Sequence, residues 1–315
     1  MQFNSKYVEL HSHSFYSFGE GASQVHELVS RAVELGYPAM ALTDYNMCGA
    51  LEFSRQAKSL NLHSIIGSEV ILEDQSHIVL LAENHKGYSN ITRLLSIANS
   101  YDRKNPRLHK KHLKDYSEGV IALIGPGRIS KLALDGNDYD AVNDVTKYIE
   151  WFGPKSVYIE LNRNYVHNDL NKCRHLNRLA NEVELPVVAT NNVRFLEESS
   201  FEAHEARVCI NERFTLDDPR RPKIYTNQQY LRSADEMENL FEDIPEAITN
   251  TEKVAERCNV VLNFEENHLP RFPVPEGQTL NDYFESVVHD GFERRIEALQ
   301  AGITGKTNGS SGWAS

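Results

Sequence analysis

The stretch Glu9-Leu-His-Ser-His13 is the most informative part of this 315-residue chain. The apolar residues of Tyr7–Leu10 predict a strand that runs into a loop. Residues two apart on a strand project to the same face, so His11 and His13 would present two imidazoles side by side. Imidazole is the commonest metal ligand, and Glu20 adds a carboxylate a few residues later. The stretch predicts a metal site, although two polar residues at a strand end are also common without one.

The composition is that of an ordinary globular protein, with 40% hydrophobic and 25% charged residues. The net charge is −12, and the acidic residues are spread along the chain. This balance argues against a surface that grips phosphate backbones, because such a surface needs clustered Lys and Arg. A nucleic-acid role would therefore have to come from a local site or from a partner.

Cysteine usage and the amino terminus indicate the compartment. The cysteines are far apart and form no C-x-x-C pair, which argues against a disulfide framework or a zinc ribbon; they are Cys48, Cys173, Cys209 and Cys258. The first residues lack the apolar run of a signal peptide. No apolar window approaches the length of a membrane span, so we expect a cytoplasmic protein without membrane contact.

Short apolar runs alternate with amphipathic segments as far as Thr190, which predicts a parallel sheet or a β/α barrel. Strands are expected over Tyr7–Leu10, Ala39–Thr43, Ser64–Val70, Ile78–Ala82, Val120–Ile124, Val157–Leu161 and Pro186–Thr190. Helices are expected between them, over Val25–Leu35, Gly49–Ser59, Lys86–Ser100, Tyr139–Phe152 and His167–Val183.

The pattern changes after Thr190. Leu269–Pro275 is rich in proline and cannot be helical, and Gly302–Ser315 is rich in Gly, Ser and Thr and predicts a disordered end. Further helices are expected over Phe195–Ile210, Ser233–Cys258 and Asn281–Leu299.

Polar residues collect where the expected strands end, which is where β/α folds place their chemistry. Each one alone has an ordinary explanation; Asp44, for example, could be a helix N-cap. Together they predict a present or former metal site. The residues at this rim are His11, His13, Glu20, Asp44, Tyr45, Glu69, Asn191, Asn192 and Arg194, and His77 opens the following strand.

Three of these stretches, His11–Gly21, Ala41–Asp44 and Ile65–Glu69, resemble the successive motifs of the polymerase-and-histidinol-phosphatase (PHP) domain. The form they resemble lies at the amino terminus of bacterial family C DNA polymerases, the alpha subunit of DNA polymerase III and its error-prone paralogue. The run Val188–Val193 favours the error-prone branch. The likeness continues through His77–Tyr88, Pro186–Val193, Glu236-Met237, Pro245–Thr251 and His268–Gly277.

The resemblance implies a fold and a domain organisation. The expected fold is α/β, a distorted seven-fold TIM-like barrel (the PHP fold) with a C-terminal helical extension. Residues 1–268 would form the PHP domain. Residues 269–301 would form a connector and the start of a truncated polymerase palm region, and residues 302–315 a disordered tail.

The resemblance also implies metal ligands. Intact PHP sites hold a cluster of ions, often zinc or manganese, for phosphoester hydrolysis, which in some polymerases is a proofreading 3′–5′ exonuclease. His11, His13, Glu69 and His77 match ligand positions, and Glu20 stands where an aspartate is usual.

Four other ligand positions depart from the family pattern. Tyr45 replaces a histidine, Pro126 a cysteine, and Asn192 and Arg194 stand where the family has Asp-x-His. Proline has no side-chain donor, asparagine is a weaker neutral ligand, and tyrosine coordinates only when deprotonated.

Arginine at the last of these positions has the strongest effect, because it is always charged and cannot be a ligand. We expect the Arg194 guanidinium to reach into the pocket and neutralise Glu69, Glu20 or Asp44 in place of a cation. Zinc or manganese would then bind partially or not at all.

Three functions remain open on these grounds. The favoured one is the PHP fragment of an alpha-type or error-prone DNA-directed DNA polymerase, acting in DNA replication or repair without activity of its own. Its partners would be the missing polymerase core, which would bind the Mg²⁺ for nucleotidyl transfer, or other replication and translesion subunits. The alternatives are a metal-dependent phosphoesterase or 3′–5′ exonuclease with a reduced site on His11, His13 and Glu69, and a non-catalytic interaction module.

Overall fold

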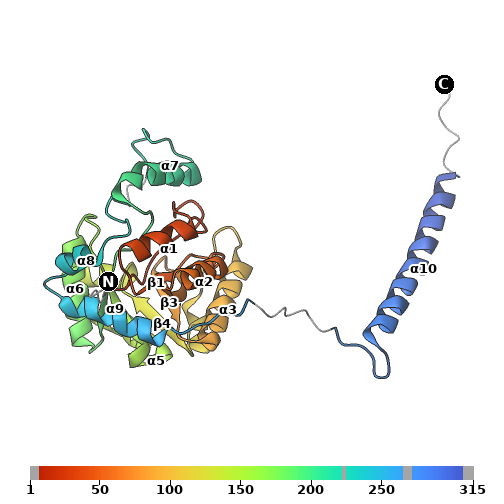
Figure 1. The fold of residues 1–315 in the computed structure, drawn as a ribbon, viewed down its shortest axis with the longest axis horizontal. Helices are drawn as coiled ribbons and strands as arrows, with labels where there is room; N and C mark the ends of the chain where they lie inside the picture. Colours follow the sequence, from red (N-terminus) through yellow and green to blue (C-terminus); the bar gives the residue numbers. More distant parts are fainter. Residues whose placement is uncertain (1–6, 222–224, 265–271, 308–315) are drawn as a thin grey trace. The chain divides into compact units, whose positions relative to one another are not determined.

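The computed structural model describes residues 7–221, 225–264 and 272–307, and its main feature is one curled six-stranded sheet wrapped by helices (Figure 1). The strands lie in the sheet in chain order. They are β1 (Ala39–Leu42), β2 (His63–Ile71), β3 (His77–Ala82), β4 (Val120–Ile124), β5 (Val157–Asn162) and β6 (Val187–Thr190).

One strand of the sheet is reversed. β3 pairs antiparallel with both β2 and β4, whereas the other neighbouring strands are parallel. The connection from Ile71 to His77 is a short turn, and a parallel pair would need a much longer crossover. The beginning of β3 therefore lies beside the end of β2. This reversal places His77 at the same rim as Glu69.

The strand expected over Tyr7–Leu10 is not formed, and the seven-fold barrel is not confirmed. The segment instead makes isolated parallel bridges, Glu9 with Met40 of β1 and Ser12 with Val193 beyond β6. Its regular pairing is interrupted because the Glu9 carboxylate accepts hydrogen bonds from the backbone amides of His11 (2.9 Å) and Asn191 (3.0 Å). The segment thus lies between the two edge strands of the sheet without becoming a strand.

The helices of the first two hundred residues agree with the expected ranges to within a few residues at each end. One short helix, α4, was not expected, because its sequence has no clear amphipathic period. The helices are α1 (Val25–Glu34), α2 (Ala50–Ser59), α3 (His85–Tyr101), α4 (Arg128–Leu134), α5 (Asp138–Phe152) and α6 (Asp169–Glu182). Single 3₁₀ turns are η1 (Lys110–His112), η2 (Lys114–Tyr116), η3 (Pro154–Ser156) and η4 (Glu198–Ser200).

Two expectations for the later helices are wrong. The single helix expected over Ser233–Cys258 is two helices, α8 (Ala234–Leu240) and α9 (Pro245–Arg257). Pro245 disfavours helical backbone at the residue before it and suits the first position of a new helix. The helix expected from Phe195 begins later, as α7 (Phe201–Glu212), because Phe195 bridges to Tyr230.

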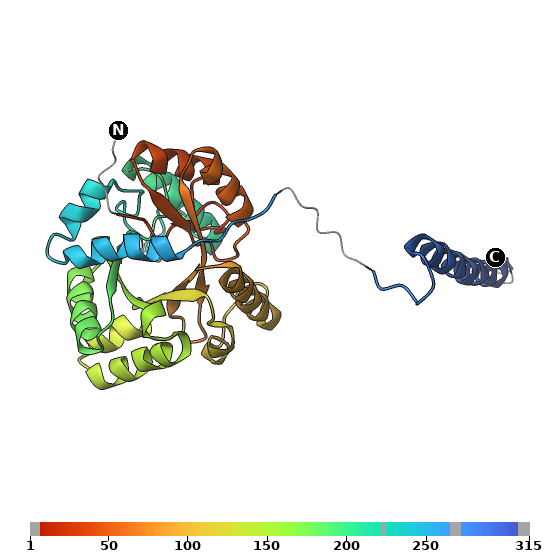
Figure 2. The same cartoon turned by 60° about the horizontal axis from the view of Figure 1, so that its bottom comes forward.

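The interior of the curled sheet is a separate apolar core. Alternate strand residues such as Ala41, Ile65 and Leu123 meet there, and Val254 and Cys258 from α9 and its end join them. α9 lies across the sheet in Figure 2 and contributes to this inner core. A larger core packs between the outer face of the sheet and the surrounding helices.

The chain divides into two compact units, residues 1–262 and 263–315. The boundary expected at residue 268 falls outside the described residues. In the second unit Phe272–Pro275 is irregular and α10 runs from Leu280 to Thr307, beyond the expected end at Leu299. Residues 302–307 of the expected tail are therefore helical, and the remainder lies outside the described residues. None of the described helices combines the length and apolar character that a membrane-spanning helix needs.

The close packing of α3 against the start of β4 yields a stability prediction. A Cβ on Gly87 would overlap the carbonyl oxygen of Gly119, so Gly87→Ala should lower the free energy of unfolding by about 1–3 kcal/mol. Urea denaturation followed by circular dichroism measures this. Gly291→Ala is the control, since a Cβ there meets nothing within 4 Å and should leave the unfolding midpoint of the first unit unchanged. Equal midpoints for Gly87→Ala and the unmodified chain would contradict the packing.

Candidate metal centre

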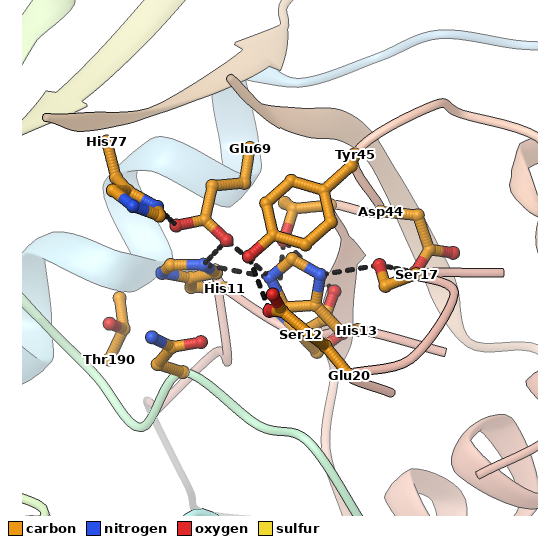
Figure 3. A network of polar contacts seen from close by, with 12 residues as sticks. His11, Ser12, His13, Ser17, Glu20, Asp44, Tyr45, Glu69, His77 and Thr190 are labelled. Atoms are coloured by element: carbon orange, nitrogen blue, oxygen red, sulfur yellow. Dashed lines mark hydrogen bonds and ion pairs between the residues drawn. The ribbon is translucent and has the colours of Figure 1, made fainter. Parts of the chain in front are cut away.

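Two imidazoles and one carboxylate converge at the rim of the sheet (Figure 3). Oε2 of Glu69, near the end of β2, lies 2.9 Å from Nε2 of His13 and 3.4 Å from Nε2 of His11. The three side chains are buried. Oε1 of the same carboxylate lies 2.7 Å from Nδ1 of His77, which is partly exposed. Glu69 is therefore the centre of the cluster.

Arg194 occupies the cluster as well. Its Nη2 donates to Glu69 Oε2 at 3.2 Å, the oxygen that also faces both imidazoles, and its Nη1 donates to Glu20 Oε2 at 2.9 Å. Tyr45 completes this group, because its hydroxyl donates to Glu20 at 2.7 Å and accepts from Arg194 at 3.2 Å. The guanidinium is buried and lies against two of the three carboxylates that the sequence suggested for it.

Asp44, the third of those carboxylates, is linked to the cluster through Ser17, which contacts His13. It accepts hydrogen bonds from the hydroxyls of Ser14 and Ser17, each at 2.6 Å. Ser17 Oγ also lies 2.7 Å from Nδ1 of His13. Because the single Ser17 proton goes to Asp44, Ser17 Oγ accepts from the His13 Nδ1–H, which fixes the orientation of the ring.

The two adjacent imidazoles hold protons very differently. Burial alone would lower the pKa of His11, but the carboxylates of Glu160 and Glu69 outweigh it and raise this pKa from 6.5 to about 10. Burial, reinforced by Arg194, lowers the pKa of His13 to about 3. The two shifts favour the charged form of His11 and the neutral form of His13, although their Nε2 atoms lie only 3.1 Å apart.

Burial alone would raise the pKa of the Glu69 carboxyl, but His11 and Arg194 hold it well below its usual value. Burial, only partly offset by Arg194, raises the pKa of the Tyr45 phenol well above 10, so that this side chain remains a neutral hydrogen-bonding group. A phenol in that state is not a metal ligand.

Among the described residues, one group of donors lies close enough together to hold a single metal ion. One ligand atom from each of His11, His13 and Glu69 lies within 4.8 Å of the others, and two imidazoles with a carboxylate is a donor set that zinc accepts. An ion there would have to displace the proton of His11, because a ligating histidine must present a lone pair.

Two of the positions that depart from the family pattern, Asn192 and Pro126, make no polar contact with the cluster among the described residues. Asn192 adopts a left-handed backbone (φ 47°), and its buried Oδ1 has no hydrogen-bond partner among the described residues. Pro126 lines a separate small pocket beside Ser130 and Lys172. Neither makes a polar contact with His11, His13 or Glu69 within the described ranges, so neither replaces the ligand that the family has there.

Two buried carboxylates that hold the site were missed in the sequence. Glu160 lies in β5, and its Oε1 is 2.7 Å from Nδ1 of His11. Glu9 orients the backbone of the first segment, and burial raises its pKa to about 7. The sequence did indicate Glu160, which lies inside the predicted buried strand Val157-Tyr-Ile-Glu-Leu161. A buried acidic residue needs a partner, so this position could have been assigned to the site.

Comparison with known proteins supports the resemblance. The family model of the PHP domain matches residues 9–164. The chain is 38% identical to DNA polymerase III subunit alpha of Pseudomonas aeruginosa over 304 residues, and 38% identical to that of Escherichia coli K12 over 305 residues. Each alignment covers 93% of this chain but 26% of the relative, so the chain spans about a quarter of the length of these relatives.

Among solved structures, an amidohydrolase from Chromobacterium violaceum is similar over 64% of this chain and 96% of its own, with 16% identity and a TM-score of 0.42. A likeness at this level carries no argument about the chemistry of this chain.

The wall beside Arg194 yields a pH prediction. His204 of α7 is buried among the rings of Phe195, Phe201 and Tyr225. Burial, reinforced by Arg194, lowers its pKa from 6.5 to about 4. The unfolded chain therefore takes up a proton that the folded chain resists, so the titration of His204 leaves stability unchanged above pH 6.5 and destabilises the fold progressively as the pH falls from 6.5 toward 4.

We expect His204→Gln to remove about 3 kcal/mol of the pH dependence of unfolding between pH 7 and pH 4, because glutamine does not titrate. Urea denaturation at a series of pH values measures the slope, which is independent of any constant loss of stability in the variant. An unchanged slope would show that His204 titrates normally.

Proposed function

Since this chain carries a PHP domain homologous to that of bacterial DNA polymerase III alpha subunits, we propose that it belongs to an alpha-type or error-prone polymerase in which the PHP barrel is structural. In this proposal the barrel supports the polymerase core and does not hydrolyse phosphoesters. The observation that carries the proposal is the Arg194 guanidinium, which is ion-paired with Glu69 and Glu20 inside the cluster.

Charge is the physical reason. Two like unit charges about 4 Å apart repel by about 4 kcal/mol at the effective dielectric constant of a protein surface, and a divalent ion doubles the repulsion. An ion on His11, His13 and Glu69 would have a guanidinium on the same Glu69 oxygen. Together with a protonated His11, Arg194 already supplies the positive charge that the buried Glu69 needs. The same two groups that stabilise the apo cluster therefore oppose the binding of metal.

The second unit supports a role as part of a larger assembly. Within the second unit the apolar side chains of α10 are not covered, and an apolar helix face of this kind usually has a partner. These exposed residues are Leu280, Phe284, Val287, Val288, Phe292 and Leu299. We propose that the remaining part of the polymerase covers them and holds the Mg²⁺ for nucleotidyl transfer.

One observation favours a second function, a phosphoesterase with a single ion. The ligand atoms of His11, His13 and Glu69 already converge, and a zinc or manganese ion held by them would supply Lewis-acid activation of a phosphoester. For this function Arg194 would have to share Glu69 with the ion.

Metal content separates the two functions. We expect the chain, purified in the presence of zinc or manganese, to carry well below one ion per chain by elemental analysis, since the guanidinium opposes the ion. We also expect no hydrolysis of bis-p-nitrophenyl phosphate or of a single-stranded 3′ end. One ion per chain with hydrolysis, both lost in His11→Ala, would establish the single-ion phosphoesterase and overturn the structural role.

Removing the guanidinium tests its role directly. Arg194→Ala leaves Glu69 buried without its partner, so it should lower the free energy of unfolding by about 3–5 kcal/mol. Zinc should restore part of this loss, because the vacated position then accepts a cation beside Glu69. Denaturation with and without zinc measures the rescue.

Arg163→Ala is the matched control for that rescue. Arg163 is also a buried arginine, paired with Asp243 at 2.6 Å and distant from the cluster, so its variant should lose stability without recovery in zinc. Equal zinc effects on the two variants would show that Arg194 does not stand in for a cation.

A further inference from the structure

A pocket of the first unit lies between the loop after β5, the first turns of α6 and the end of α8, and neither function above uses it. α6 and α8 lie next to each other in Figure 1. The cavity volume is about 520 Å³, which is in the range of small-molecule sites. The lining of this α6 pocket shares no residue with the metal cluster. It includes Arg163, Tyr165, Asp169, Leu170, Arg174 and Leu240.

The inner wall of the α6 pocket is fixed by Arg163, a buried residue directly after β5. Its Nη1 and Nη2 donate to the two carboxylate oxygens of Asp243, at 2.6 Å and 2.9 Å. Nη1 also donates to the carbonyl of Leu240 at 2.7 Å, and the guanidinium lies 4.5 Å from the centre of the Phe241 ring. These contacts join the loop after β5 to the end of α8. Asp243 balances the charge of Arg163, so this guanidinium holds the wall together and leaves a ligand to other groups.

The loop that forms the outer wall is held in a strained conformation. Tyr165 (φ 58°) and Asn168 (φ 67°) both adopt the left-handed backbone, which is unfavourable for residues with a side chain. The loop keeps this shape because Oδ2 of Asp169 accepts hydrogen bonds from the amides of Asn164 and Val166, each at 2.9 Å. Strained backbone of this kind is concentrated at binding sites. The wall is therefore formed before any ligand arrives.

The outer wall exposes apolar side chains at the pocket. Tyr165 is 69% exposed and Leu170 is 55% exposed, and both line the cavity. Leu240 adds an apolar group from α8. Burial of these surfaces by the apolar body of a ligand would be favourable, because water is released from them.

Arg174 supplies the charge that the α6 pocket offers to a ligand. It lies one turn after Leu170 on α6, so both side chains are on the same face of the helix. Within the part of the chain that the structure describes, its exposed side chain forms no ion pair and no hydrogen bond. Arg163, with a smaller contribution from Arg174, lowers the pKa of Asp243, but the oxygens of Asp243 are already bonded to Arg163. The guanidinium of Arg174 thus keeps its donors, and its planar fork matches a carboxylate.

The carboxylate of Asp169 also lines the α6 pocket and does not oppose an anionic ligand strongly. Its Oδ2 is taken by two backbone amides, and its Oδ1 lies 3.8 Å from Nζ of Lys172. The lining therefore combines one cation without a partner carboxylate and a mainly apolar wall.

From these observations we propose that the α6 pocket binds a small organic carboxylate that carries an aromatic or branched apolar body. Its carboxylate lies on Arg174 and its apolar body lies against Tyr165 and Leu170. A free small molecule fits better than an extended peptide, because no described residue of the lining belongs to a strand on which a peptide backbone could pair. Binding requires no metal ion and no hydrolysis, so it does not depend on the role proposed for the rim cluster.

The test is a ¹⁹F NMR titration of 5-fluoroindole-3-propionate with the full chain in EDTA. We expect saturable binding with a Kd of about 1 mM or tighter. The corresponding primary amide has the same apolar body without the charge and should bind at least about tenfold more weakly.

Two substitutions separate the charge from the apolar wall. Arg174→Gln should weaken binding of the acid at least about tenfold and leave the weak binding of the amide unchanged within about twofold, which also shows that the variant pocket is folded. Tyr165→Ala should weaken binding of both probes about fivefold, and Tyr165→Phe should retain it.

Arg178→Gln is the matched control. Arg178 is exposed, lies one turn further along α6 outside the pocket, and is paired with Asp138 at 2.9 Å. It removes the same charge from the same helix and should change the affinity for the acid less than about twofold.

Several results would overturn the proposal. They are no binding by the unmodified chain, equal affinities for the acid and the amide, an equal loss in Arg178→Gln, and competition by inorganic phosphate as strong as by the unlabelled acid. Tighter binding of the tripeptide Gly-Gly-Trp than of the free acid, lost when its carboxyl terminus is amidated, would assign the pocket to a peptide terminus and overturn the assignment to a small molecule.

Discussion

A buried carboxylate that must be neutralised is the constraint on which the rim of this barrel depends. Glu69 is almost fully excluded from water, and an unpaired charge in such a place is very unfavourable. A metal ion is the usual solution for such a carboxylate beside two imidazoles. We propose that the positive charge here comes from Arg194, which is ion-paired with Glu69, and from a proton held on His11. In this proposal the protein keeps the geometry of a metal site and satisfies the charge of Glu69 without an ion.

Two irregularities of the sheet bring these groups together. The reversed strand β3 places its first residue, His77, beside the end of β2, where Glu69 lies. The irregular segment around His11 lies between β1 and β6, because the Glu9 carboxylate takes backbone amides that a strand would pair. The reversed strand is therefore what brings His77 to Glu69.

The sequence allowed the main elements to be predicted, since each of the six strands contains a run of apolar residues, and their side chains are buried on both faces of the sheet. It also allowed the position of Arg194 to be anticipated, because a permanent cation among carboxylates can be satisfied only by them. The break at Pro245 was readable in the sequence and was overlooked, since the apolar pattern continues through it. The irregular first segment and the Glu160–His11 pair were not predictable, because both depend on contacts between residues distant in sequence.

We propose that a guanidinium and a proton take the place of a metal ion at Glu69. The most direct measurement is a crystal structure of the unmodified chain grown with excess zinc, with data collected at the zinc absorption edge. We expect no anomalous peak between His11, His13 and Glu69, and a guanidinium of Arg194 bound to Glu20 and Glu69. An anomalous peak bonded to those three side chains, with Arg194 displaced from Glu69, would contradict it.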